Sequence, residues 1–198
     1  HEYVDLGLSV KWATCNVGAE SETDFGLYFA WGETAEKTNY AWNNSGEYEW
    51  GTYDSSDKTN YGMIKYNKTD NLITLEAGDD PAKKLWGSKW HTPTLDEINE
   101  LLDNSKCKWT WVTKKDAKGN DVNGYNVVGK NGNSIFLPAA GSRSGAELED
   151  AGKKGDYWSK SLYASGPRYA YYFYFSSGNH GWGSGSRYVG QSVRAVTE

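Results

Sequence analysis

The chain has 198 residues, of which 37% are hydrophobic, with a net charge of −5 and a mean hydropathy of −0.78. Its 15 tyrosines and 10 tryptophans supply much of the area that a core can bury, so the composition indicates an aromatic-rich globular protein rather than a disordered one. The sequence is acidic and has no Lys- or Arg-rich stretch, which argues against nucleic-acid binding. It also has no long apolar run, which argues against membrane insertion.

The first predicted element is a half-buried strand. In EYVDLGLSVKWATCNVGA, apolar and polar residues alternate from Val4 to Trp12, which is the period of a strand with one buried face, and the pattern ends at Gly18. From Tyr28 to about Gly78 the sequence is rich in Asn, Ser, Thr, Gly, Tyr and Trp but has no clear period. This stretch predicts a long ordered loop layer with short strands.

Two helices are predicted next. Asp80 is the expected N-cap of the first helix, with Pro81 as its first residue and Gly87 as its stop. Thr94 and Glu97 have the spacing of a capping box at the start of the second helix. The second helix has one apolar stripe, which is typical of a helix packed on a core: Leu95, Ile98, Leu101 and Leu102.

The second half of the chain is predicted to be mostly strand and loop. KWTWVTKK, GYNVVGKNGNSIFLPAAG and the later runs DYWSKS, AYYFYF and SVRAV are short and β-rich, and Asn123-Gly124 and Asn131-Gly132 suit tight hairpin turns. The expected class is α+β, with irregular antiparallel sheets, about two helices and long ordered loops. We expect one domain over residues 1–198, with its N- and C-terminal strands close together.

The cysteines and histidines give no sign of a catalytic or metal site. Cys15 and Cys107 lack zinc-ligand spacing, and either a long disulfide loop or two buried thiols would suit them. His1, His91 and His180 lie far apart and belong to no metal-binding motif, and His91 suits a structural place before the helix cap. We therefore predict no catalytic residue, no metal and no cofactor.

Several stretches carry a resemblance to a known family. They are YVDLGLSVKWATCNVGA, YFAWGET, DDPAKKLWGSKWHTPTLDEINELL, NGNSIFLPAAG, GDYWSKSLY and GQSVRAV, in this order from about Tyr3 to Val196. The chain resembles gut-bacterial surface proteins with a C-type-lectin-like fold, in the branch shared with formylglycine-generating enzymes. The positions of Cys15 and Cys107 do not match the reactive cysteines of those enzymes, so the resemblance implies no such activity.

Within that family the chain is most similar to the variable proteins of diversity-generating retroelements. There, a reverse transcriptase copies a template repeat, errs at adenines and writes the result into the C-terminal end of the target gene. The resemblance implies a variable ligand-binding segment, which we place at residues 157–194. It also implies an extracellular or cell-surface location, with a lipid anchor on a preceding part, or a place on a phage particle.

The genetic code offers a check on this idea. Template positions are typically Asn codons of the AAY type, and replacing their adenines cannot yield Lys, Glu, Gln, Met or Trp. From Ser161 to Gly190 the chain has no Lys, Glu, Gln, Met or Asp, and its one tryptophan there, Trp182, has a codon without adenine. The composition fits the idea, although Tyr- and Phe-rich strands with Gly- and Ser-rich loops are also ordinary β structure.

The expected binding residues are those that such codons can reach. In AYYFYF, alternation puts Tyr171, Phe173 and Phe175 on one face, which we expect to be core, and Tyr172 and Tyr174 with Ser176 on the other. The second face would join loop residues in a shallow, solvent-facing patch. The predicted variable positions are Tyr163, Arg168, Tyr169, Tyr172, Tyr174, Ser176, His180, Gly183, Ser184, Gly185, Ser186, Tyr188 and Val189. The expected scaffold positions around them are Trp158, Ala170, Trp182, Gly190, Val193 and Arg194.

The expected function is non-enzymatic recognition of a variable protein or glycan ligand. The alternative is a metal-independent carbohydrate-binding module of a surface adhesin, because the tripeptides of calcium-dependent sugar sites do not occur while Tyr and Trp rings pack well on sugar faces. A purely structural module of a surface appendage is the third hypothesis.

Overall fold

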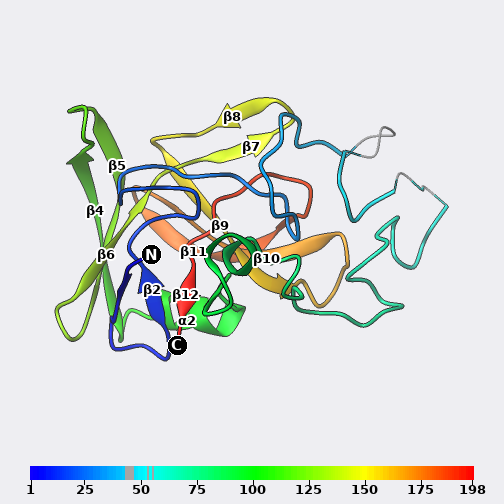
Figure 1. Cartoon of the computed structure of the whole chain (residues 1–198), viewed down its shortest axis with the longest axis horizontal. Helices are drawn as coiled ribbons and strands as arrows, with labels where there is room; N and C mark the ends of the chain where they lie inside the picture. Colours follow the sequence, from blue (N-terminus) through cyan, green and yellow to red (C-terminus); the bar gives the residue numbers. More distant parts are fainter. Residues whose placement is uncertain (43–46, 53, 55) are drawn as a thin grey trace.

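In the part of the chain that the structure describes, the regular elements are antiparallel sheets and two short helices, so the class is α+β (Figure 1). The computed structural model describes residues 1–42, 47–52, 54 and 56–198. The helices are α1 (Pro81–Trp86) and α2 (Leu95–Leu102). The strands are β1 (Tyr3–Val4), β2 (Lys11–Ala13), β3 (Trp90–His91), β4 (Cys107–Lys115), β5 (Asp121–Gly129), β6 (Ser134–Pro138), β7 (Ser142–Ser144), β8 (Glu147–Glu149), β9 (Lys154–Leu162), β10 (Tyr169–Ser176), β11 (Asn179–Ser186) and β12 (Val196–Thr197).

The two ends of the chain share one sheet, in the strand order β1-β2-β12-β3, so the expected proximity of the terminal strands is confirmed. The single strand predicted from Val4 to Trp12 is wrong, because β1 and β2 form an antiparallel pair. The chain bends at Gly7, where φ is +77° and the side chain of Asp5 accepts the Gly7 N–H. Leu6 is nevertheless buried, as the alternation predicted.

Both helices begin where their capping residues predict. The Asp80 carboxylate accepts N–H groups from the first turn of α1, and Gly87 follows its last residue. At α2, Thr94 accepts the N–H of Glu97 while the Glu97 carboxylate accepts the N–H of Thr94. His91 contacts the same carboxylate at 3.1 Å, so its predicted structural role beside the cap is confirmed.

Strands β4, β5 and β6 form a second antiparallel sheet, and only one of its predicted turns is right. Asn131-Gly132 lies in the β5–β6 turn, with Gly132 at φ +86°. Asn123-Gly124 instead lies inside β5, where a Cβ atom on Gly124 would come within 2.2 Å of the Leu137 carbonyl oxygen. Gly124 is therefore needed because the backbone of β6 comes very close to it, and not because the chain turns there.

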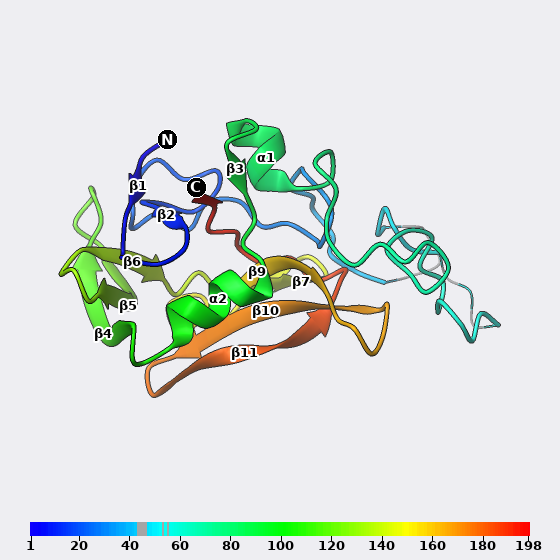
Figure 2. The ribbon, with the colours of Figure 1, turned by 90° about the horizontal axis from the view of Figure 1, so that it is seen from below.

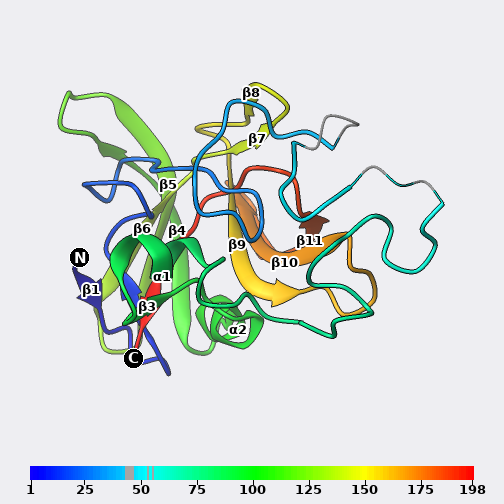
Figure 3. The same cartoon turned by 45° about the vertical axis from the view of Figure 1, so that its right-hand side comes forward.

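The predicted loop layer from Tyr28 to Gly78 has isolated bridges rather than short strands in its described part; residues 43–46, 53 and 55 lie outside that part. Side-chain hydrogen bonds to backbone hold it in place. The Tyr40 hydroxyl donates to the Tyr28 carbonyl at 2.6 Å, and the Trp50 indole donates to the Gly32 carbonyl at 2.7 Å. Figure 3 shows this layer extending past the ends of β10 and β11.

The main core lies between the β4–β5–β6 sheet and the β9–β10–β11 sheet, with α2 covering part of the second sheet (Figure 2). Phe173 and Phe175 of β10 lie in it, as predicted, and contact Trp109 of β4. Cys15 and Cys107 are buried free thiols, which decides between the two alternatives for them. Burial raises the pKa of both thiols.

Candidate ligand-binding surface

The β9–β10–β11 sheet carries most of the predicted variable positions, and its register defines two faces. Tyr174 lies opposite Asp156 of β9 and Gly181 of β11, so these three residues share one face, here called the tyrosine face. Phe173 lies opposite Tyr157 and Trp182, so these residues share the other face, here called the phenylalanine face.

On the tyrosine face, the rings of Tyr172 and Tyr174 lie over a strip of glycines. The alternating sequence of β11 places Gly181, Gly183 and Gly185 on this face. A Cβ atom on Gly183 would lie 3.4 Å from Cε1 of Tyr172 and 3.7 Å from Cε1 of Tyr174. A methyl group at Gly183 would thus sit in ordinary contact with both rings, so the rings lie close above this strand without filling the space of a Cβ atom.

The tyrosine face opens into a cavity of about 480 Å³ beside the β7–β8 hairpin. It is lined by Ser142, Asp150, Lys154, Asp156, Tyr172, Tyr174, Phe175, Ser176 and Asn179. Loss of solvent raises the pKa of Asp156 to about 6, although a hydrogen bond from Ser142 and the charge of Lys154 act in the opposite direction. Lys154 forms an ion pair with Asp150 at 3.1 Å.

The phenylalanine face is covered near the β10–β11 turn. His180 stacks on Trp109 of β4, with 4.6 Å between ring centroids and 3° between planes. Burial lowers the pKa of His180. His180 therefore lies against the second sheet, and the predicted shared patch of His180 with Tyr172 and Tyr174 is wrong because the three residues lie on opposite faces.

Farther along the phenylalanine face lies a cluster of four rings, three of them half-buried and one exposed, here called the aromatic patch: Tyr163, Tyr169, Tyr171 and Trp182. Tyr171 is 5.3 Å from Tyr163 and 5.6 Å from Trp182 between ring centroids. Trp182 is 49% exposed, so this expected scaffold residue reaches the surface. Tyr171, which we expected in the core, is only half-buried, and its ring contacts those of Tyr163 and Trp182.

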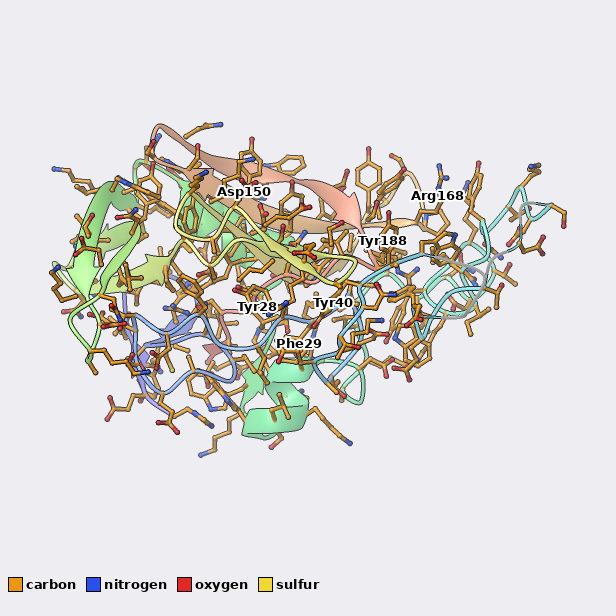
Figure 4. The ribbon with its side chains drawn as sticks, turned by 90° about the horizontal axis from the view of Figure 1, so that it is seen from above. Tyr28, Phe29, Tyr40, Asp150, Arg168 and Tyr188 are labelled. Atoms are coloured by element: carbon orange, nitrogen blue, oxygen red, sulfur yellow. The ribbon has the colours of Figure 1, made fainter. Side chains whose placement is uncertain are left out.

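A third group of predicted residues lies where the sheet meets the loop layer (Figure 4). The Arg168 guanidinium lies over the Tyr61 ring at 4.6 Å, and the Tyr188 ring is 6.3 Å from that of Trp42. A cavity of about 240 Å³ lies here, lined by Trp42, Met63, Arg168, Tyr169, Ser186 and Tyr188. Figure 4 places Asp150 well apart from Arg168 and Tyr188, so the two cavities are separate.

The predicted variable positions therefore form three surfaces rather than one shallow patch. The tyrosine face holds Tyr172, Tyr174, Ser176, Gly183 and Gly185. The phenylalanine face holds His180, Ser184 and Ser186 with the aromatic patch, while Tyr188 and Val189 lie in the turn after β11. Period-two alternation separates the first two surfaces, and the loop layer creates the third.

Two buried arginines anchor the segment that follows β11. Arg194 donates to Asn16 and to the carbonyls of Ala13 and Phe136, as befits its expected scaffold role. Arg187, which no sequence pattern singles out, is also fully buried and donates to the Tyr48 hydroxyl and to the carbonyls of Lys65, Tyr66 and Pro167. Nothing in the local sequence separates Arg187 from the exposed Arg168, because its partners are more than 100 positions away or lie in an unpatterned loop.

The surface has the chemistry of a binding site: aromatic rings, hydroxyls and one partly desolvated carboxylate. Within the described residues, no three His, Cys, Asp or Glu side chains gather as a metal site. No helix among those residues has the length and apolarity needed to cross a membrane. Comparisons of the chain with protein-family models, with curated proteins and with solved structures found no match.

Proposed function

We propose that the chain is a non-enzymatic ligand-binding protein with a C-type-lectin-like fold, whose C-terminal segment, residues 157–194, is diversified by adenine-directed mutagenesis. The segment displays an aromatic-rich surface that binds a protein or glycan ligand. The protein works outside the cell, at the cell surface or on a phage particle, and the resemblance to retroelement variable proteins motivates this proposal.

The observation that carries the proposal is how burial divides the segment. None of the predicted variable positions is buried, whereas the expected scaffold positions Trp158, Ala170, Gly190, Val193 and Arg194 all are. Only Trp182 departs from this division. A segment whose exchangeable positions all reach the surface can change its side chains without losing its core.

The composition of these positions suits recognition. Tyrosine presents a large amphipathic area on few rotatable bonds, and serine and glycine add adaptable hydrogen bonding and close backbone approach. The β9–β10–β11 sheet and the buried Arg187 hold the backbone beneath these side chains. A rigid backbone with exchangeable side chains lowers the entropic cost of binding.

The decisive test is the DNA that flanks the gene. It should hold a reverse-transcriptase gene and a near-copy of the codons for residues 157–194, with adenines at the positions named above. If neither is present within the same locus, the diversification proposal fails. Finding the repeat with adenines at the codons of buried residues instead would also contradict it.

The aromatic patch favours a second candidate function, which is metal-independent carbohydrate binding. The exposed Trp182 and the half-buried Tyr171 form an edge-to-face pair, and such rings pack on the apolar faces of sugars. A glycan array, read with and without a chelator, tests this function. Sugar-specific binding that survives the chelator and is lost in Trp182→Ala would support it, and an empty array would count against it.

A further inference from the structure

The cavity on the tyrosine face combines residues of two origins. Asp156, Asp150 and Lys154 precede the proposed variable segment, whereas Tyr172 and Tyr174 lie within it. The charged groups therefore belong to the constant part of the chain, and the rings belong to the part that changes. Any ligand property that depends on charge would then be shared by all versions of the site.

The charges in the cavity do not cancel. Lys154 is paired with Asp150, and both side chains are about half exposed. No Lys, Arg or His among the described residues forms an ion pair with Asp156; Ser142 donates a hydrogen bond to it, and Lys154 acts on it only at longer range. An ionised Asp156 thus leaves the cavity with one net negative charge.

Two aromatic rings stand beside this carboxylate. Tyr174 is the cross-strand neighbour of Asp156, and the ring of Tyr172 lies 5.9 Å from that of Tyr174 with 47° between their planes. Burial and the nearby Asp156 charge raise the pKa of Tyr172, so its phenol stays neutral. Neutral tyrosine rings attract cations through their negative faces.

We propose that this cavity binds a basic side chain, arginine or lysine, of a protein ligand, with Asp156 as the counter-ion and Tyr172 and Tyr174 as the rings that contact the cation. The inference rests on the proposed function, since it names the ligand chemistry of that surface. A carboxylate in a poorly hydrated place is unfavourable unless it is paired, and a bound cation provides the missing pair. An anionic ligand would meet the same carboxylate and be repelled.

The test uses small probes and the whole chain. We expect n-butylguanidinium to shift the amide NMR signals of β9 and β10 around Asp156 and Tyr174 saturably, with a Kd on the order of 1 mM. The anion n-butyrate should cause no such shifts. Equal responses to the two probes, or saturable shifts only on other strands, would overturn the proposal.

Charge variants in opposite directions separate the site from general effects. Asp156→Asn should weaken n-butylguanidinium binding about tenfold, whereas Lys154→Ala, which frees Asp150, should tighten it several-fold. Asp121→Asn removes the same charge from an exposed side chain of β5 and should leave the Kd unchanged. If Asp121→Asn weakens n-butylguanidinium binding as much as Asp156→Asn does, the Kd depends only on the net charge of the protein and the proposed specific site is wrong.

The ring contribution has its own variants. Tyr174→Phe keeps the ring and should keep the Kd within about twofold, while Tyr174→Ala should raise it severalfold. Circular dichroism and thermal melting confirm that each variant is folded. If Tyr174→Ala is folded and binds as the parent does, the rings take no part and the proposal fails.

The pH dependence follows from the groups that face Asp156, which are Asp150 and Lys154 with Ser142, Tyr172 and Tyr174. The hydrogen bond and charge of Asp150 raise the pKa of Lys154, so it stays charged throughout the range from pH 5 to pH 7. Because ionised Asp156 should bind the cation about tenfold more tightly than the neutral form, which Asp156→Asn mimics, the affinity should fall about fivefold from pH 7 to pH 5. No change over this range would contradict the assignment of Asp156 as the counter-ion.

A peptide arm tests the protein ligand. The peptide acetyl-Gly-Gly-Arg-Gly-Gly-amide should bind, and its citrulline counterpart, which is neutral and nearly isosteric, should not. If n-butylguanidinium binds but the peptide does not, the cavity takes small free cations and the proposed protein ligand is wrong. These outcomes are independent of the flanking DNA, so failure here leaves the proposed function to its own test.

Discussion

The two faces of β10 carry equally aromatic side chains but have different surroundings. On the phenylalanine face, Phe173 and Phe175 are fully buried against Trp109 and the second sheet. On the tyrosine face, Tyr172 and Tyr174 are only half-buried and line an open cavity. Alternation determines which side chains share a face, whereas segments distant in the sequence decide which face is covered.

The largest expected effect comes from truncating one ring on each face. Phe173→Ala removes a ring that stacks on Tyr157 at 4.9 Å and contacts Trp12, and we expect the free energy of unfolding to fall by about 3 to 5 kcal/mol. Tyr174→Ala, one residue on, should cost about 1 kcal/mol, since its ring is partly hydrated. Urea unfolding measures both values, and similar losses would break the comparison.

Glycine substitution compares the faces through one methyl group. A Cβ atom on Gly155, on the phenylalanine face, would lie 2.2 Å from Cζ of the buried Phe175, and Gly155→Ala should cost about 2 to 3 kcal/mol. Gly183→Ala, on the tyrosine face, places its methyl group at ordinary contact distance from Tyr172 and Tyr174. It should range from neutral to a gain of about 0.5 kcal/mol in unfolding free energy. Thermal melting of the two variants checks the difference, and a larger loss for Gly183→Ala would reverse the assignment of faces.

Local sequence was sufficient for some elements and insufficient for others. Asp80 and the pair Thr94 and Glu97 located both helices, because caps act within four residues of the helix start. Asn123-Gly124 misled the turn prediction because the β4–β5 turn is built instead by Asp116, whose carboxylate accepts the N–H groups of Lys118 and Asn120. Whether the chain makes a turn at an Asn-Gly pair or continues as a strand depends on the neighbouring strand that packs against that pair.

The candidate site shows the same limit. The split of Phe173 and Phe175 from Tyr172 and Tyr174 follows from alternation and was predicted. The exposure of Trp182 was not, because alternation places it on the same face as the buried Phe173 and does not say how far the core extends over that face. The anchoring of Arg187 depends on the carbonyls of Lys65, Tyr66 and Pro167, which no local pattern identifies.

A medium effect is expected from the carboxylate on the tyrosine face. The pKa of Asp156 is raised to about 6 by burial, so the folded protein holds this proton more tightly than the unfolded chain does. Its contribution to stability is present below pH 4 and is lost as the pH rises through about 6. Asp156→Asn cannot ionise, so at pH 7 it should be more stable than the parent by about 1 to 2 kcal/mol.

The measurement is the unfolding free energy of the parent and of Asp156→Asn between pH 4 and pH 8. The difference should grow from pH 4 to pH 6 and be constant above pH 7. A constant difference over the whole range would mean that Asp156 is well hydrated in the fold. The tyrosine face would then be an ordinary hydrated surface. The two faces would differ in hydration by more than the raised pKa of Asp156 indicates.

The smallest effect is expected where the phenylalanine face itself becomes surface. Trp182 is 49% exposed and lies over the edge of Tyr171, so Trp182→Ala should lower the unfolding free energy by less than about 1 kcal/mol. The matched control is Trp158→Ala, which removes a fully buried ring and its hydrogen bond to the Phe29 carbonyl and should cost about 3 to 5 kcal/mol. Equal losses in urea unfolding would mean that Trp182 is part of the core. Trp182 lies directly opposite the buried Phe173 on the neighbouring strand. A small loss for Trp182→Ala would therefore mean that the core ends between these two residues. The phenylalanine face would then be core at β10 and solvent-exposed surface at β11.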